Sequence, residues 1–94
     1  MIKPYTKDIS KDNYILFFAN SDCFPCKLLE EEIKDLSIDI YRVNISEDLK
    51  IAQDFDVLSI PTLIFMKNNI KVYTTSGVRN LKDLNKILQH FHMI

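Results

Sequence analysis

The stretch YILFFANSDCFPCKLLEEEIKDL, residues 14–36, decides the fold of this chain. It begins with an unbroken apolar run over residues 14–19, which predicts a strand that is covered on both faces. A polar turn follows at residues 20–22. From about Phe24 to Leu36 the apolar residues recur with the period of an amphipathic helix. The stretch therefore predicts a buried strand that a tight turn joins to a helix.

Two cysteines open this helix, Cys23 and Cys26. Residues three apart lie on the same side of a helical turn. Cys23 falls where free backbone N–H groups and the positive end of the helix dipole converge, which favours the nucleophilic thiolate over the thiol. Pro25 suits the first turn, where a backbone N–H needs no partner. A CxxC between a strand and a helix therefore predicts a redox motif.

Two other interpretations of the cysteine pair remain open at this stage. The cysteines could be inert buried thiols, although cysteines at a helix N-terminus rarely behave so. They could also form half of a zinc site, with His90 and His92 as further ligands. The H-x-H spacing of these histidines is unlike the usual finger pattern, and they suit the last turn of a helix instead.

The overall composition predicts one domain over residues 1–94. Hydrophobic residues make up 47% and charged residues 27%, as in ordinary globular proteins. The net charge of -1 gives no electrostatic reason to expect nucleic acid or a membrane surface as partner. The N-terminus has no apolar signal-peptide core, so we expect a cytoplasmic location. There, a lone cysteine pair is more often catalytic or metal-binding than structural.

The flanking segments predict further elements. Residues 2–6 suit a short edge strand, since Pro4 is tolerated at an edge, and residues 7–13 form at most one helical turn. Residues 38–45 predict a strand that runs parallel to the first buried strand through a right-handed crossover. Ser46 resembles the N-cap of a helix whose Leu49, Ala52 and Phe55 face inward.

The C-terminal part predicts a hairpin and a helix. Two strands, residues 62–67 and 70–75, flank Asn68–Asn69, and asparagine tolerates the positive φ of a two-residue turn. Asn80, with Asp83 three residues on, resembles a capping box. The residues expected to face the sheet from the following helix are Leu81, Leu84, Ile87, Leu88 and Phe91.

Ile60-Pro61-Thr62 stands just before the strand at residues 62–67. Cys-x-Pro-Cys followed by Ile-Pro-Thr resembles the thioredoxin family, and the resemblance continues through Gly77 to the final helix. It implies an α/β thioredoxin fold, in which a central mixed sheet of four to five strands has helices on both faces. The order β-β-α-β-α-β-β-α implies that the family's first helix is shortened or absent.

The resemblance also implies an activity, thiol–disulfide exchange that reduces protein disulfides. Cys23, at the exposed tip, would attack the substrate disulfide, and the shielded Cys26 would resolve the mixed disulfide. The redox-active disulfide Cys23–Cys26 would serve without a cofactor or a metal. The implied partners are disulfide-containing proteins and a thioredoxin reductase or similar electron donor, and we expect a monomer.

The family's substrate-binding residues can be carried over by motif. Pro61 would be a cis proline beside the sulfurs, and the backbone of Ile60 would pair with an extended substrate segment. Gly77 and Val78 match the family's third loop at the site. Together with Phe24 and Pro25, the residues Ile60, Pro61 and Val78 would form a small exposed apolar patch around Cys23.

The chain departs from the family pattern at several positions. Asp22 stands where the family usually has Trp; its carboxylate opposes thiolate formation at Cys23 and could also cap the helix, so it is a candidate pKa modulator. Phe17 replaces a buried acid that helps to deprotonate the second cysteine, so the proton of Cys26 would leave through water or Asp22. Arg42 takes the place of a lysine near that acid, which leaves its role open.

Two further departures lie in the helix, where Phe24 replaces a glycine and Glu31 replaces a proline. We therefore expect Cys26 to resolve the mixed disulfide more slowly than in a typical thioredoxin. Two alternative functions follow from the departures and the length. One is a glutaredoxin-like, glutathione-dependent reductase, and the other is a binding module in which the cysteine pair is vestigial.

Overall fold

The computed structural model describes residues 2–94, and this part of the chain contains five strands and three helices. In chain order the elements are β1 (Ile2–Pro4), β2 (Asn13–Ala19), α1 (Phe24–Ile33), β3 (Asp39–Asn44), α2 (Leu49–Asp54), β4 (Thr62–Lys67), β5 (Ile70–Ser76) and α3 (Leu81–His90).

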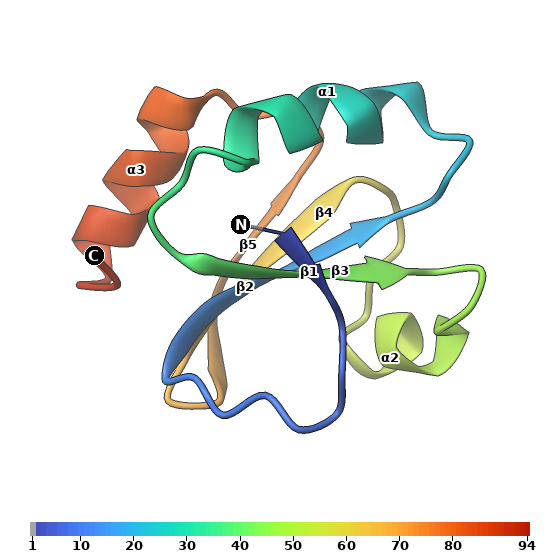
Figure 1. Cartoon of the computed structure of the whole chain (residues 1–94), viewed down its shortest axis with the longest axis horizontal. Coiled ribbons are helices and arrows are strands. Elements are labelled where there is room, and N and C mark those ends of the chain that lie inside the picture. The colour runs from blue at the N-terminus through green and yellow to red at the C-terminus, as the bar shows by residue number, and fades with distance from the viewer. Residues whose placement is uncertain (1) are drawn as a thin grey trace.

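The five strands form one mixed sheet in the order β1-β3-β2-β4-β5. β1, β3 and β2 run parallel, whereas β4 is antiparallel to both of its neighbours. α1 and α3 cover one face of the sheet and α2 covers the other (Figure 1). This arrangement is the thioredoxin fold expected from the sequence.

The family's first helix is absent, since no helix precedes α1 within residues 2–94. The segment between β1 and β2 has no regular secondary structure. Its Tyr5 and Ile9 pack against the apolar cluster between the sheet and α2. Two apolar side chains thus supply part of the cover on this face.

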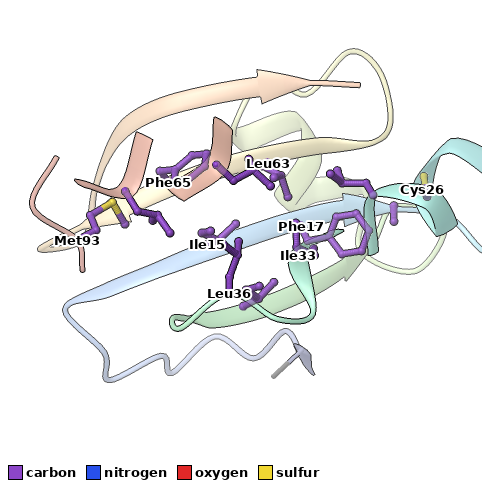
Figure 2. Close-up of a cluster of buried hydrophobic side chains, with 13 residues drawn as sticks. Ile15, Phe17, Cys26, Ile33, Leu36, Leu63, Phe65 and Met93 are labelled. Atoms are coloured by element: carbon purple, nitrogen blue, oxygen red, sulfur yellow. The ribbon is translucent and has the colours of Figure 1, made fainter. Parts of the chain in front are cut away.

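Two apolar clusters, one on each face of the sheet, hold the helices in place. Successive side chains of β2 point to opposite faces, so β2 contributes residues to both clusters. Ile15, Phe17 and Ala19 point towards α1 and α3, whereas Tyr14, Leu16 and Phe18 point towards α2. Figure 2 shows the first cluster, with Cys26 at one end and Met93 at the other. The cysteine motif is therefore anchored to the main core.

Several boundaries differ from the sequence-based expectation, and β1, expected over residues 2–6, ends at Pro4. α1 ends at Ile33 and not near Leu36. Ser46 is not an N-cap; its hydroxyl donates to Asn44 Oδ1 at 2.7 Å, and α2 begins only at Leu49. Because the helix starts later, Leu49 does not face inward and is 58% exposed. Ala52 is buried as expected.

The turn and cap chemistry expected for the C-terminal part is confirmed. Asn68 and Asn69 adopt φ values of 53° and 63°, as a tight hairpin turn requires. The Asn80 side chain accepts the backbone N–H of Asp83 at 2.8 Å and so caps α3. Local side-chain chemistry therefore places the start of α3 just after the loop that contains Gly77.

Candidate active site

Three loops meet at one end of the sheet. Phe18, near the end of β2, pairs with Thr62, and Thr62 pairs with Ser76 at the end of β5. The segments that leave these strand ends are the turn before Cys23, the loop that ends in Pro61, and the loop from Gly77 to Asn80. The N–H of Gly77 donates to the carbonyl of Pro61 at 2.9 Å and ties the last two together.

The first loop carries the cysteine pair, which forms a disulfide with a Cα–Cα distance of 5.2 Å. Cys23 is the N-cap of α1, and its sulfur accepts the backbone N–H of Cys26 at 3.1 Å. Cys23 is partly exposed, whereas Cys26 is only 1% exposed. The two sulfurs therefore differ in access to a visiting molecule.

Asp22 lies in the exposed turn before Cys23 and does not cap the helix. The expectation that it could act as the cap is wrong, because Cys23 itself occupies the N-cap position. Its effect on the cysteines remains a prediction that rests on its charge and its place next to Cys23.

The second loop contains a cis peptide bond between Ile60 and Pro61. The Thr62 hydroxyl donates to the carbonyl of Ser59 at 2.6 Å, which links the residues on either side of Ile60-Pro61. Ile60 packs partly buried against the cluster that contains Cys26, as does Cys23. The cis-proline loop and the cysteine loop thus pack on the same apolar cluster.

The apolar surface around Cys23 is smaller than expected. Phe24 and Val78 are 69% and 45% exposed, and Pro25 is exposed as well. Pro61, however, is buried, so it adds little surface of its own. Gly77 has φ +83°, a left-handed conformation that side chains rarely adopt, which explains why glycine stands beside Val78.

Sequence reasoning missed an apolar groove next to the cis-proline loop. It has a volume of about 180 Å³ and is lined by Ile45, Leu49, Ala52, Val57, Leu58, Ser59 and Ile60. Leu58 is 97% exposed. In the sequence, the only sign of this groove is the apolar Leu58 shortly before Ile60-Pro61. The fold is needed to show that α2 forms the opposite wall of the groove.

Beneath Cys26, the side chain that replaces the family's acid is fully buried. Phe17 is 0% exposed and lies towards the Cys26 end of the cluster in Figure 2. The Arg42 guanidinium stands 5.5 Å from the centre of the Phe17 ring and forms an ion pair with Glu30 of α1. The structure thus gives Arg42 a cation–π partner and a carboxylate partner.

No group of three or more His, Cys, Asp and Glu side chains among residues 2–94 could hold a metal ion. His90 packs edge-on against the ring of Phe91, with 4.8 Å between ring centres. In the same residues none of the helices has the length and apolar character needed to cross a bilayer.

Comparisons with known proteins agree with this geometry. The family model described as Thioredoxin matches residues 2–90. A thioredoxin from Malassezia sympodialis is 33% identical over 83 residues, which cover 81% of this chain and 79% of that protein. A thioredoxin from Chlamydia pneumoniae is 29% identical, with 87% of this chain and 94% of that protein covered.

Solved structures agree as well. The crystal structure of the Malassezia sympodialis thioredoxin superposes with a TM-score of 0.71 at 30% identity, covering 84% of this chain and 77% of that one. A mutant thioredoxin from Halobacterium salinarum gives a TM-score of 0.84 over 96% of this chain and 88% of that one. Its identity is 16%, so it supports the fold alone.

Proposed function

Since this chain belongs to the thioredoxin family, we propose that it reduces disulfide bonds of other proteins by dithiol–disulfide exchange. The observation that carries the proposal is the disulfide between a partly exposed helix-cap cysteine and a buried cysteine one turn further on. This arrangement gives the two sulfurs different roles. Family membership with such a pair supports a thiol–disulfide oxidoreductase in general, and the steps below are our proposal.

In the reduced protein, the Cys23 thiolate attacks one sulfur of the substrate disulfide. The other substrate sulfur leaves with the bonding electrons, and a mixed disulfide to Cys23 forms. Cys26 then attacks Cys23 as a thiolate, and the second substrate sulfur leaves. Two electrons have passed to the substrate, which becomes a dithiol, and Cys23–Cys26 becomes the disulfide seen here.

We assign substrate contact to the loops around Cys23. The exposed side chains of Phe24, Pro25 and Val78 supply apolar contact. The backbone of Ile60 pairs with an extended substrate segment in strand fashion, and Pro61 and Gly77 hold that loop in place through their hydrogen bond. Asp22 tunes the Cys23 thiolate through its charge.

The proposal implies a cytoplasmic monomer that acts without a further cofactor. A flavoprotein thioredoxin reductase or a similar donor would return the disulfide to the dithiol. Protein disulfides are the substrates because an exposed apolar surface surrounds Cys23, which suits a polypeptide chain.

The test is the reduction of insulin disulfides by the protein, with serine substituted at each cysteine in turn. We expect Cys23→Ser to abolish reduction, because the attacking thiolate is lost. Serine is itself a good N-cap, so the helix start should be retained. Cys26→Ser should also stop turnover but accumulate a mixed disulfide with the substrate, detectable by non-reducing electrophoresis and mass spectrometry.

The same experiment separates the alternatives. Turnover with NADPH and thioredoxin reductase, but little with glutathione alone, agrees with the proposal, whereas the reverse favours a glutathione-dependent enzyme. If Cys23→Ser leaves reduction or the biological function intact, the cysteine pair is vestigial and the chain acts as a binding module.

A further inference from the structure

Cys26 must lose its proton before it can attack, but its side chain is 1% exposed, and the ring of Phe17 lies towards its end of the same apolar cluster (Figure 2). A phenyl ring accepts no proton from a thiol. We propose that Glu30, held in place by Arg42, accepts the proton of Cys26 during resolution of the mixed disulfide. This inference rests on the proposed function and names a residue that acts in its second step.

The first support is helical spacing. Cys26 and Glu30 are four residues apart within α1, so they lie on neighbouring turns of one face, with Cβ atoms about 5–6 Å apart. This spacing would let the Glu30 carboxylate reach towards the Cys26 sulfur, directly or through one water molecule.

The second support is the division of roles among three consecutive glutamates. Glu31 pairs with Lys34, and Glu32 accepts the backbone N–H of Leu81 at 2.8 Å. Glu30 instead turns towards the sheet and pairs with Arg42 of β3. Its side chain is 42% exposed, against 67% for Glu31. Glu30 is therefore the glutamate of this run that lies on the Cys26 face.

Arg42 acts as a positioning residue. It sits opposite Phe17 in the pairing of β2 with β3, and its guanidinium lies over the Phe17 ring. From there it donates to Glu30 Oε1. The ring and the carboxylate together fix the guanidinium, and the guanidinium fixes the carboxylate beneath α1, one turn from Cys26.

The third support is a solvent route. Glu30 and Arg42 line a groove of about 590 Å³, none of whose lining residues belongs to the three loops around Cys23. A proton on Glu30 can reach water there while a substrate covers Cys23. The ionisable groups that line this groove beside Glu30 are Lys3 on β1 and Tyr5 just after it, Glu31 on α1 and Lys34 at its C-cap, Arg42 on β3, and Glu47 and Asp48 before α2.

The S–H bond of Cys26 breaks and its proton moves to the Glu30 carboxylate. The Cys26 sulfur forms a bond to the Cys23 sulfur, and the bond between Cys23 and the substrate sulfur breaks. That substrate sulfur leaves with the electron pair as a thiolate, and Glu30 passes its proton to water in the groove.

The experiment uses the reduced protein and Ellman's disulfide reagent, followed by stopped-flow absorbance. Attack by Cys23 releases one coloured thiolate, and attack by Cys26 on the resulting mixed disulfide releases the second. The rates of both phases are measured against pH in the unsubstituted protein and in Glu30→Gln. Glu31→Gln is the matched control, because it makes the same change one residue away in the same groove.

We expect Glu30→Gln to slow the second phase about tenfold or more at neutral pH and to leave the first phase unchanged. The deficit should shrink as the pH rises, because more of the thiol then ionises to hydroxide or water without the carboxylate. Glu30→Asp should restore part of the rate, and Glu31→Gln should match the unsubstituted protein in both phases. The second-phase rate of Arg42→Lys should lie between those of the unsubstituted protein and Glu30→Gln. Lysine keeps the positive charge but lacks the planar guanidinium that holds the carboxylate in place.

Several outcomes would overturn the inference. Equal second-phase rates in Glu30→Gln and Glu31→Gln would remove Glu30 from the step, and a deficit of the same size at every pH would show a purely structural role. Slowing in Asp22→Asn but not in Glu30→Gln would assign the proton to Asp22. If the unsubstituted protein releases only one equivalent, the proposed function itself fails, and this inference fails with it.

Discussion

Cys23 has two roles at the start of α1. It forms half of the disulfide, and its sulfur also accepts the N–H of Cys26 as the cap of the helix. A hydrogen bond from a backbone amide and the positive end of the helix dipole both favour a negatively charged sulfur. In the proposed function, the features that begin the helix are therefore the same features that prepare Cys23 for attack.

Phe17 shows how one substitution changes the requirements on its neighbours. A buried ring at this position strengthens the core between β2 and α1, but it leaves no acid on the strand. The Arg42 guanidinium lies over the ring instead and pairs with Glu30 of α1. In our proposal, Phe17 therefore fills the core while Glu30 accepts the proton.

Tyr5 and Tyr14 make stability depend on alkaline pH. Burial, helped by Asp48 and Asp54 near Tyr5 and by Tyr5 and Tyr41 near Tyr14, raises the pKa of both phenols above the ordinary 10.0. Their contribution to stability is therefore complete below pH 10 and is lost as pH rises through the raised pKa values. We expect the free energy of unfolding in urea to fall above that pH, with a smaller fall in Tyr14→Phe.

Tyr73 provides the matched control for this measurement, because it is 43% exposed on the edge strand β5. Tyr73→Phe removes an exposed hydroxyl by the same chemical change, so a smaller alkaline slope in Tyr14→Phe than in Tyr73→Phe would assign the difference to the phenol of Tyr14. If Tyr73→Phe reduces the slope as much as Tyr14→Phe does, the alkaline loss does not come from the buried phenols.

At the scale of elements, the N-terminus of α3 is held from two sides. Asn80 accepts the N–H of Asp83, and Glu32 reaches across from α1 to accept the N–H of Leu81, each at 2.8 Å. An acid at this end also suits the helix dipole. Because α3 begins just after the loop that contains Gly77 and Val78, Glu32 links that loop to the helix of the cysteines.

We expect Glu32→Ala to lower the free energy of unfolding by about 1–2 kcal/mol, and Asn80→Ala by about 1 kcal/mol. Glu32→Gln should lose less, because the amide oxygen still accepts a hydrogen bond. Urea titration gives the stabilities, and faster hydrogen exchange at the Leu81 amide reports the broken bond. Glu31→Ala is the control; a loss as large as that of Glu32→Ala would show that the cross-helix bond is not the cause.

The whole molecule should respond to reduction of Cys23–Cys26. The disulfide closes a short loop, which restricts the unfolded chain and stabilises the oxidised protein by about 2 kcal/mol. We expect urea midpoints to be lower for the reduced protein than for the oxidised one. The double substitution of both cysteines by serine should show one midpoint under both conditions. A reduced form that is the more stable would contradict this and indicate an oxidant rather than a reductant.

The way in which the two faces of the sheet are covered is also a property of the whole molecule. On one face, α1 and α3 bury the larger cluster (Figure 1). On the other, the six-residue α2 is assisted by Tyr5 and Ile9 from the irregular segment between β1 and β2. The fold therefore keeps both faces covered without the family's first helix.

Much of the architecture could be predicted from the sequence because local chemistry determines it. The apolar run of β2, the asparagines of the β4–β5 turn and the Asn80 cap each act within a few residues, and the structure confirms them. The start of α2 could not be predicted in this way. Ser46 has the chemistry of an N-cap, but its hydroxyl bonds to Asn44, and the helix begins at Leu49.

The sequence by itself determined the order of elements, the family and the pair of cysteines at a helix start, since spacing and residue type suffice for these. Only the tertiary structure decided that Pro61 is buried, that Leu58 borders a groove with α2, and that Arg42 joins Phe17 to Glu30. The physical reason is that burial and pairing across strands depend on residues far apart in the chain, and their contacts form only when the sheet brings them together.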